Sequence, residues 1–140
     1  MVVATSSVLA NSVLLDSHIV IWLATDPERI LRKIRNRVLN AERRFVSSIT
    51  YSEVALKHRK FPEQFPFTVT HLDEAMESQA NFELSFTAAH ARVLSQIPAL
   101  HKDPFDHMLL AQAVSEGLAF ATMDHTLLPY GRSLKGLRLI

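Results

Sequence analysis

Short apolar runs alternate along the chain with longer amphipathic segments. The runs that we predict to be strands are residues 13–15, 45–47, 82–86, 118–122 and 136–140. The segments that we predict to be helices are residues 18–25, 27–42, 49–60, 69–80, 87–96 and 103–117. Strands separated by helices are typical of a mostly parallel sheet that is covered on both faces. The pattern therefore predicts an α/β fold, a three-layer α/β/α sandwich with a central sheet of four to five strands.

The clearest helix boundaries belong to the segment DPFDHMLLAQAVSEG. Asp103 is a typical N-cap, Pro104 suits the first helical position, where its missing N–H costs nothing, and Gly117 suits the end. Pro27 suits the start of the helix over residues 27–42 in the same way. That helix also carries an apolar stripe, which we expect to pack inward and which consists of Ile30, Leu31, Ile34 and Val38.

Charge is unevenly distributed, although the formal net charge is only +1. Residues 28–44 carry seven Arg or Lys and two Glu, whereas residues 71–83 carry four acidic residues and no Arg or Lys. A basic helix of this kind can follow a phosphate backbone, or it can be a solvated surface whose apolar stripe packs inward. We favour the solvated surface, because charged residues are ordinary on protein surfaces.

The composition predicts one compact domain. The chain has 140 residues, of which 48% are hydrophobic, and it has no cysteine, which excludes disulfides, thiolate metal sites and a Cys nucleophile. Its most apolar window, residues 13–24, is too short to span a bilayer. Residues 1–12 lack the basic start and apolar core of a signal peptide, so we interpret them as a flexible leader before a domain over residues 13–140. We expect a cytoplasmic protein that does not contact membranes.

Four acidic residues are placed where an α/β fold brings side chains together. Asp16 and Asp124 each follow an apolar run that we predict to be a strand, and Glu53 and Asp106 each lie in the first turn of a predicted helix. Because ligands of open parallel sheets gather beyond the carboxyl ends of the strands, we expect all four at one edge. Clustered carboxylates repel one another, and a divalent cation with a preference for oxygen ligands relieves this repulsion. The sequence therefore predicts an Mg²⁺ or Mn²⁺ site that can act on a phosphodiester.

Each acid also has a purely structural explanation. Asp16 and Asp124 can cap the helix or turn that follows them. Thr50 and Glu53 have the spacing of a capping box, and the DPFD segment has a similar spacing. One such residue is weak evidence for a catalytic site, but four caps at one sheet edge would themselves form an acidic cleft.

The chain resembles PIN-domain proteins, and more closely VapC-type toxins of toxin–antitoxin pairs, from about Val13 to its C-terminus. The segments that carry this resemblance are LLDSHIVIWLA, VSSITYSEVALK, HKDPFDHMLLAQAVSEGL and ATMDHTLLPYG. The most specific feature is DPFD followed by an apolar stretch and AQA. The resemblance implies a metal-binding catalytic cluster of Asp16, Glu53, Asp106 and Asp124. It also implies that the hydroxyls of Ser17 and Thr122 help to arrange the site, and that Asp103 is a helix cap first and an accessory ligand second.

The activity that the resemblance implies is that of an Mg²⁺- or Mn²⁺-dependent endoribonuclease toxin. Such a toxin cleaves cellular RNA of the tRNA or rRNA class by water attack on the phosphodiester, and thereby inhibits translation. The resemblance further implies a homodimer, neutralisation by a VapB-like antitoxin, and contact with DNA only through that antitoxin. Aromatic residues that offer apolar surface to such a partner, or else belong to the core, are Trp22, Tyr51, Phe61, Phe65 and Phe67.

Two other classes of protein remain open from the sequence. One is a catalytically inactive PIN-like module that acts only through protein contacts. The other is a phosphoacceptor receiver-like domain, which also gathers acids at the edge of a parallel sheet. A receiver would need a lysine after a late strand near the acids, and the segment FATMDHT has none.

Overall fold

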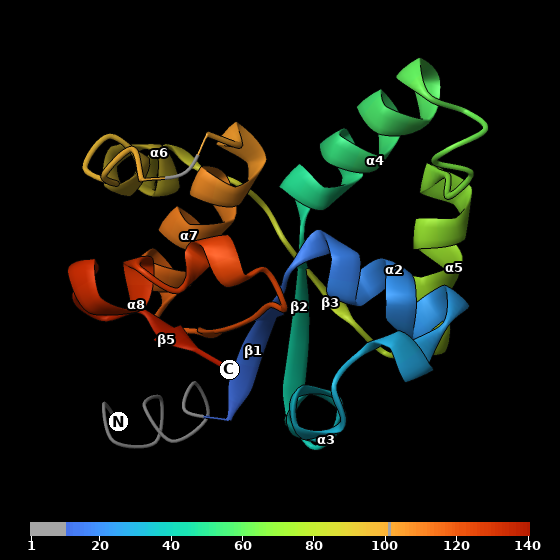
Figure 1. The fold of residues 1–140 in the computed structure, drawn as a ribbon, viewed down its shortest axis with the longest axis horizontal. Helices are drawn as coiled ribbons and strands as arrows, with labels where there is room; N and C mark the ends of the chain where they lie inside the picture. The colour runs from blue at the N-terminus through green and yellow to red at the C-terminus, as the bar shows by residue number, and fades with distance from the viewer. Residues whose placement is uncertain (1–10, 101) are drawn as a thin grey trace.

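A five-stranded parallel sheet forms the centre of the protein in the computed structural model, which describes residues 11–100 and 102–140. Every neighbouring pair of strands in this sheet is parallel. In spatial order the strands are β3 (Phe82–Leu84), β2 (Arg43–Ser47), β1 (Ser12–Leu15), β4 (Ala119–Ala121) and β5 (Arg138–Leu139) (Figure 1). The predicted parallel sheet is confirmed, and β1 lies in its middle.

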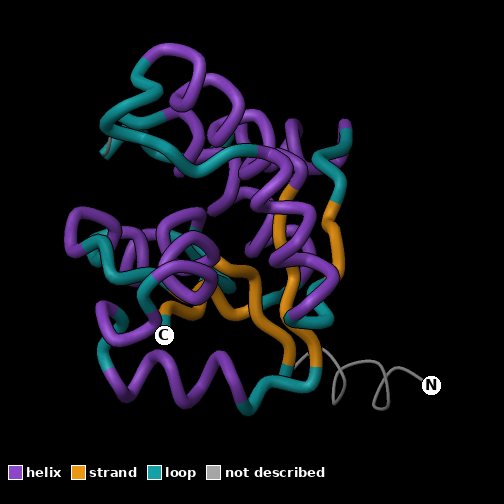
Figure 2. Tube along the Cα trace, turned by 90° about the vertical axis from the view of Figure 1, so that its right-hand side faces the viewer, coloured by secondary structure: helices purple, strands orange, loops and turns teal. Residues whose placement is uncertain are grey.

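Helices cover both faces of this sheet, and Figure 2 shows the strands side by side with helical segments packed around them. Because successive side chains of a strand point to opposite faces, Val13 and Leu15 join one buried core and Leu14 joins the other. The first core is covered by α2 (Ser17–Thr25), α3 (Arg32–Leu39), α4 (Ser48–Lys60) and α5 (Val69–Ser78). On the other face lie α7 (Pro104–Glu116) and α8 (Tyr130–Ser133), and α6 (Ala88–Leu94) packs against α7. The predicted three-layer α/β/α sandwich is therefore confirmed.

The basic segment after α2 is not one continuous helix, so this prediction is wrong. Pro27–Arg29 forms a short 3-10 turn, and Ile30 and Leu31 are extended, with ψ of 130° and 134°, before α3 begins. The break places Ile30 in the core, whereas Leu31 is 59% exposed and leaves the predicted inward stripe. Burial of Ile30 compensates for the helical hydrogen bonds that the break removes.

The α7 helix has the boundaries that its sequence predicts. Asp103 is the N-cap, and its Oδ1 accepts a hydrogen bond of 2.9 Å from the amide of Phe105. Gly117 ends the helix in the left-handed region at φ 70°, where a side chain would be strained. The pattern missed two short helical elements after β4, a 3-10 turn at His125–Leu127 and α8, because so few residues show no periodicity.

The predicted leader falls mostly outside the described residues. Of residues 1–12, the structure describes Asn11 and Ser12, and Ser12 is already the first residue of β1. Across the described part of the chain, we find no helix with the length and apolar character needed to cross a bilayer.

Candidate active site

Strands β1 and β4 end side by side, and each is followed by a polar residue. Leu15 pairs in register with Ala121, so Asp16 and Thr122 leave the sheet together. The amide of Asp16 donates to the carbonyl of Ala121 at 2.9 Å, and the hydroxyl of Thr122 donates to Oδ2 of Asp16 at 2.7 Å. Both side chains are buried. The sheet edge therefore fixes the position of Asp16, as the sequence predicts.

The next residue, Ser17, connects this edge to α4. Its hydroxyl donates to Oε1 of Glu53 at 2.8 Å and lies 2.9 Å from the hydroxyl of Thr50. The second carboxylate oxygen of Glu53 accepts a hydrogen bond of 2.5 Å from Nζ of Lys57. Glu53 is buried, and both of its carboxylate oxygens accept hydrogen bonds from polar neighbours within the protein.

The capping-box explanation for Glu53 is wrong. The N-cap of α4 is Ser47, whose hydroxyl accepts a hydrogen bond from the amide of Ile49. The helix thus begins at Ser48, and Glu53 lies in its second turn instead of its first. The sequence pattern misplaced this start because the helix follows strand β2 without a loop. Thr50 and Glu53 therefore do not cap α4, and both contact Ser17 instead.

The N-terminal turn of α7 approaches the same place from the opposite side. Asp106 lies in this turn and is only 8% exposed. The negative charges of Asp103 and Asp106 both act on Lys57 of α4, so these groups lie close enough to interact electrostatically. Asp103 thus caps α7, and its charge acts on the same lysine as the charge of Asp106.

Asp124 is linked to Thr122 through its backbone. Its amide donates to the Thr122 hydroxyl at 3.0 Å, and that hydroxyl donates to Asp16. The Asp124 carboxylate accepts hydrogen bonds from the amide and hydroxyl of Thr126, so it caps the 3-10 turn as its structural explanation predicts. Asp16, in contrast, makes no side-chain capping hydrogen bond to α2, and the structural explanation fails there.

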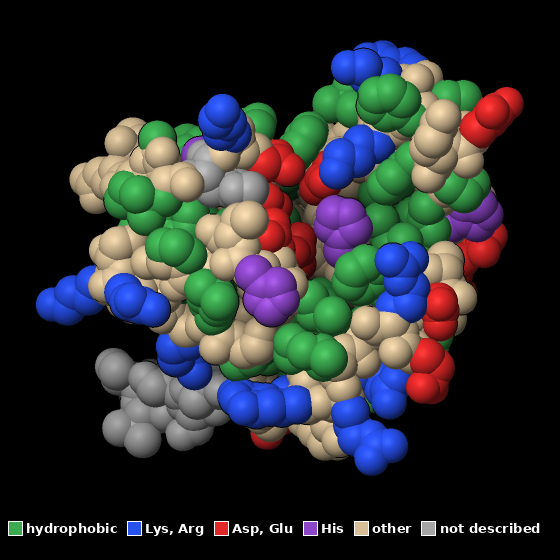
Figure 3. Space-filling model, viewed as in Figure 1, with side chains coloured by type: hydrophobic (Ala, Val, Ile, Leu, Met, Phe, Trp, Pro, Cys, Tyr) green, Lys and Arg blue, Asp and Glu red, His purple; other side chains and the backbone are tan. Residues whose placement is uncertain are grey.

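The electrostatics of the site are those of carboxylates held away from water. Burial raises the pKa of Asp16, and the charge of Glu53 raises it further, whereas the Thr122 hydrogen bond and His18 oppose the shift. Burial alone would lower the pKa of Lys57, but its hydrogen bond and ion pair with Glu53, aided by Asp103 and Asp106, raise it overall. Figure 3 shows acidic side chains gathered in a hollow at the centre of one face. Lys57 already compensates part of this negative charge.

The donor chemistry of the cluster fits a hard divalent cation. Its ligand atoms are carboxylate and hydroxyl oxygens, which suit Mg²⁺ and Mn²⁺. Within residues 11–100 and 102–140, no three His, Asp or Glu side chains are arranged as a ready-made metal site. Instead Thr122, Ser17 and Lys57 hold oxygens of Asp16 and Glu53.

Sequence reasoning missed Lys57 and Thr50 as members of the site. The signal for Lys57 was available, since Glu53 and Lys57 are separated by four residues and such pairs meet on one helix face. Thr50 had no such signal, because its contact with Ser17 joins segments that are 33 residues apart. Of the predicted accessory residues, Ser17 and Thr122 lie within the hydrogen-bond network, whereas Asp103 accepts from the amide of Phe105 and acts on Lys57 through its charge.

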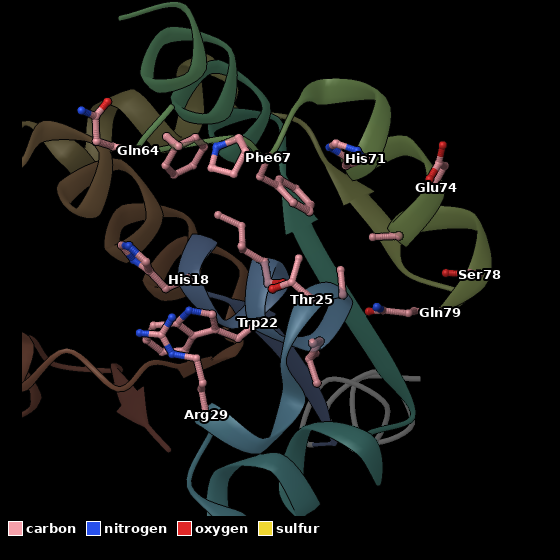
Figure 4. Close-up of a pocket in the computed structure, with 16 residues that line it drawn as sticks. His18, Trp22, Thr25, Arg29, Gln64, Phe67, His71, Glu74, Ser78 and Gln79 are labelled. Atoms are coloured by element: carbon pink, nitrogen blue, oxygen red, sulfur yellow. The ribbon is translucent and has the colours of Figure 1, made fainter. Parts of the chain in front are cut away.

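A cavity of about 740 Å³ opens between α2, α5 and the loop before α5. Figure 4 shows His18 and Trp22 on one side of it and Phe67 and His71 on the other. The guanidinium of Arg29 lies 4.7 Å from the centre of the Trp22 ring. Because His18 lies two residues after Asp16, this aromatic cavity adjoins the acidic cluster.

Comparison with known proteins identifies the family. A family model described as PIN domain matches residues 13–131. The chain belongs to the PIN domain family. This assignment confirms the resemblance at the level of the PIN domain and contradicts the receiver-like alternative. PIN domains are generally nucleases that depend on a divalent metal ion.

Two solved structures that are similar to this PIN domain are toxin–antitoxin complexes. One is VapBC2 from Rickettsia felis bound to a DNA fragment from their promoter, with a TM-score of 0.68 and 15% identity, covering 92% of this chain and 97% of that chain. The other is a toxin–antitoxin complex from Klebsiella pneumoniae, with a TM-score of 0.56 and 19% identity, covering 89% and 94%. These likenesses show a shared fold. No curated protein matches the sequence.

Proposed function

We propose that this PIN domain is a metal-dependent endoribonuclease toxin, which cleaves tRNA or rRNA and thereby inhibits translation. The observation that carries the proposal is the buried pair of Asp16 and Glu53 beyond the carboxyl ends of β1 and β2, with the N-terminus of α7 opposite. A fold gains no stability from placing carboxylates that repel each other in a common hollow. Their presence is explained by a ligand with positive charge.

The residues that would hold Mg²⁺ or Mn²⁺ are Asp16, Glu53, Asp106 and Asp124. An ion bound there supplies a water of lowered pKa as the attacking group. The chain itself keeps the carboxylates in place: Thr122 orients Asp16, Ser17 orients Glu53, and burial excludes competing solvent. Because water is the nucleophile, the 2′-hydroxyl of RNA is not consumed, and the expected products carry a 5′-phosphate and a 3′-hydroxyl.

We further propose a VapB-like antitoxin as the partner, a homodimer as the assembly, and contact with DNA only through the antitoxin. Support comes from the two similar structures, which are complexes of a toxin with its antitoxin. The cavity between α2 and α5 offers apolar surface from Trp22 and Phe65 for such contacts, whereas Phe67 belongs to the buried core beside it. A basic side chain of the partner that entered the acidic hollow would neutralise it as a metal ion does.

One alternative remains, a PIN-like module that has no catalytic activity and acts through protein contacts alone. All four acids are present, which supports the nuclease. The carboxylates of Asp16 and Glu53 accept hydrogen bonds from Thr122 and Ser17, the backbone of Asp124 contacts Thr122, and the charge of Asp106 acts on Lys57. The two functions differ in metal dependence, since only a nuclease requires a divalent ion for its effect on RNA.

The test is cleavage of total bacterial RNA by the purified protein without antitoxin, in Mg²⁺, in Mn²⁺ and in EDTA. Wild type is compared with Asp106→Asn, which removes a buried acid, and with the control Glu63→Gln, which removes an exposed one. We expect discrete fragments with 5′-phosphates from wild type and control in metal, and a loss of at least 100-fold for Asp106→Asn. Equal persistence of all RNA with folded wild type and folded variant would reject the nuclease and favour the binding module.

A further inference from the structure

A second hollow, of about 410 Å³, lies between α3 and the segment that follows β4. We call it the α3 groove. Lys33, Ile34 and Arg37 of α3 line one side, and Thr122, Asp124 and Leu128 line the other. The family assignment and the proposed catalytic cluster give no role to α3, so the groove needs its own explanation.

The α3 side of this groove is strongly basic. Residues 32–39 contain four Arg or Lys and no acidic residue. Arg35 is occupied, because it donates to the carbonyl of Pro27 and pairs with Glu28. Lys33 and Arg37 are exposed, and in the described part of the chain neither has an acidic partner. Since they are four residues apart, they lie on the same side of the helix, about 6 Å apart along its axis.

The other end of the groove is the edge of the candidate active site. Thr122 and Asp124 line the groove, and Thr122 also donates its hydroxyl to Asp16. One continuous surface therefore leads from two available cations to the buried carboxylates. In Figure 3, Lys and Arg side chains lie below the acidic hollow on the same face, over the position of α3 in Figure 1.

The positive charge at the α3 end of the groove and the negative charge at its other end are explained if the ligand is a polyanion. The carboxylate cluster by itself repels an RNA strand, so the strand needs a site of positive charge next to the cluster. We infer that the α3 groove binds the RNA backbone on one side of the cleaved bond, with phosphates on Lys33 and Arg37. This inference rests on the proposed ribonuclease function and adds to it the path of the substrate.

The apolar lining is compatible with this ligand. Ile34 and Leu128 face the space between the cations and the acids, where a ribose or a base packs while its phosphates stay at the basic rim. A peptide of a partner protein would also use the apolar lining. RNA is favoured because the groove carries exposed cations at one end and leads to Asp124 and Thr122 at the other, so a polyanion held by the cations arrives at the carboxylates.

The experiment measures RNA binding in the Asp106→Asn background, so that the probe is not cut. A fluorescent single-stranded RNA of 20 nucleotides is titrated at several salt concentrations in Mg²⁺, and anisotropy gives the affinity. The groove variant is Lys33→Gln with Arg37→Gln. The matched control is Arg59→Gln with Arg132→Gln, which removes the same charge from exposed positions on α4 and α8.

We expect the groove variant to bind at least tenfold more weakly at low salt, while the control binds within about twofold of the parent. The slope of log affinity against log salt should become shallower by about 1.4, the value for two lost phosphate contacts to a single strand. Circular dichroism should show unchanged folding for both variants, because the replaced side chains are exposed.

Four results would overturn the inference. An equal loss in the groove variant and the control would mean that only net charge matters. No loss in the groove variant, while wild type still cleaves RNA and Asp106→Asn does not, would reject the groove but leave the ribonuclease standing. Loss of antitoxin binding with unchanged RNA binding would assign the groove to a protein partner. If wild type neither cleaves nor binds RNA, the proposed function and the groove both fail.

Discussion

Two parts of α7 bury different kinds of side chain. Along its length, Leu109, Leu110 and Ala113 are fully buried and pack with Leu14 and Phe120 into an apolar core. At its N-terminal turn, the same helix buries Asp106 opposite α4, where other buried side chains are polar. The core removes only apolar surface from water, whereas the sheet edge removes charges and hydroxyls that must find partners inside the protein.

The apolar core stabilises the fold, whereas the buried charges at the sheet edge destabilise it. Burial of leucine side chains stabilises the fold by about 1.5–3 kcal/mol each. Burial of Asp16 near Glu53 opposes folding, as the raised pKa of Asp16 shows, and the hydrogen bonds of Thr122 and Ser17 offset only part of that cost. Sites of this kind are kept for what they bind and not for the stability that they provide.

The largest effect on this contrast should come from the apolar core. Leu110→Ala leaves a cavity on the inner side of α7, and we expect it to lower the free energy of unfolding by about 3 kcal/mol. RNA cleavage per folded molecule should change by less than about twofold, since the acids stay in place. Urea unfolding together with cleavage assays checks both parts. A large loss of cleavage in fully folded protein would show that core and site are not separable.

Removal of the Lys57 charge from the site should also lower the free energy of unfolding, but by less. Lys57→Met leaves the buried Glu53 without its ion pair, and we expect a loss of about 1–2 kcal/mol in the free energy of unfolding. The value is moderate because 33% of the Lys57 side chain is exposed. Lys60→Met, at an exposed position of the same helix, serves as the control and should be neutral. Equal stability of the two variants would mean that solvent replaces Lys57 without cost.

Removal of the Asp16 charge, in contrast, should raise the free energy of unfolding. Because the folded state raises the pKa of Asp16, it favours the protonated form, so the ionised carboxylate destabilises the fold as pH rises above the unfolded value. We expect Asp16→Asn to stabilise the protein by about 0.5–2 kcal/mol at neutral pH in EDTA. The gain should vanish below about pH 4, where both states are protonated. Thermal melts across this range measure it, and a variant that is less stable at pH 7 would contradict the assignment.

The smallest effect concerns the rim of α4, outside both environments. Tyr51 donates its hydroxyl to Oδ1 of Asp73 on α5 at 2.6 Å, and burial together with this acid raises the pKa of Tyr51 above its usual range. The raised pKa means that the contribution of the neutral phenol is complete below about pH 10 and is lost as pH rises further. Wild type should therefore be slightly more stable than Tyr51→Phe at pH 8, and this advantage should decrease above pH 10. A constant difference over this range would exclude the hydrogen bond as its cause.

The sequence was sufficient for the elements whose signals are local. The strand at Val13–Leu15 is a short apolar run, and α7 carries its own cap, its initial proline and its final glycine. Asp16 was placed correctly because its position after a parallel strand follows from fold class alone. The cap of α4 was predicted wrongly because the helix follows β2 without a loop, and the break before α3 was missed because it depends on which side chain reaches the core.

By itself, the sequence determined the fold class, the position of Asp16 at the end of a parallel strand, and the PIN resemblance, since periodicity and short motifs are properties of neighbouring residues. Only the tertiary structure decided that Ser17 holds Glu53 and that Thr122 holds Asp16. It alone placed Lys57 among the acids of two helices and joined α3 to the end of β4 in one groove. These contacts join residues up to 106 positions apart, and no local pattern encodes which of many possible partners a packed fold brings within hydrogen-bonding distance.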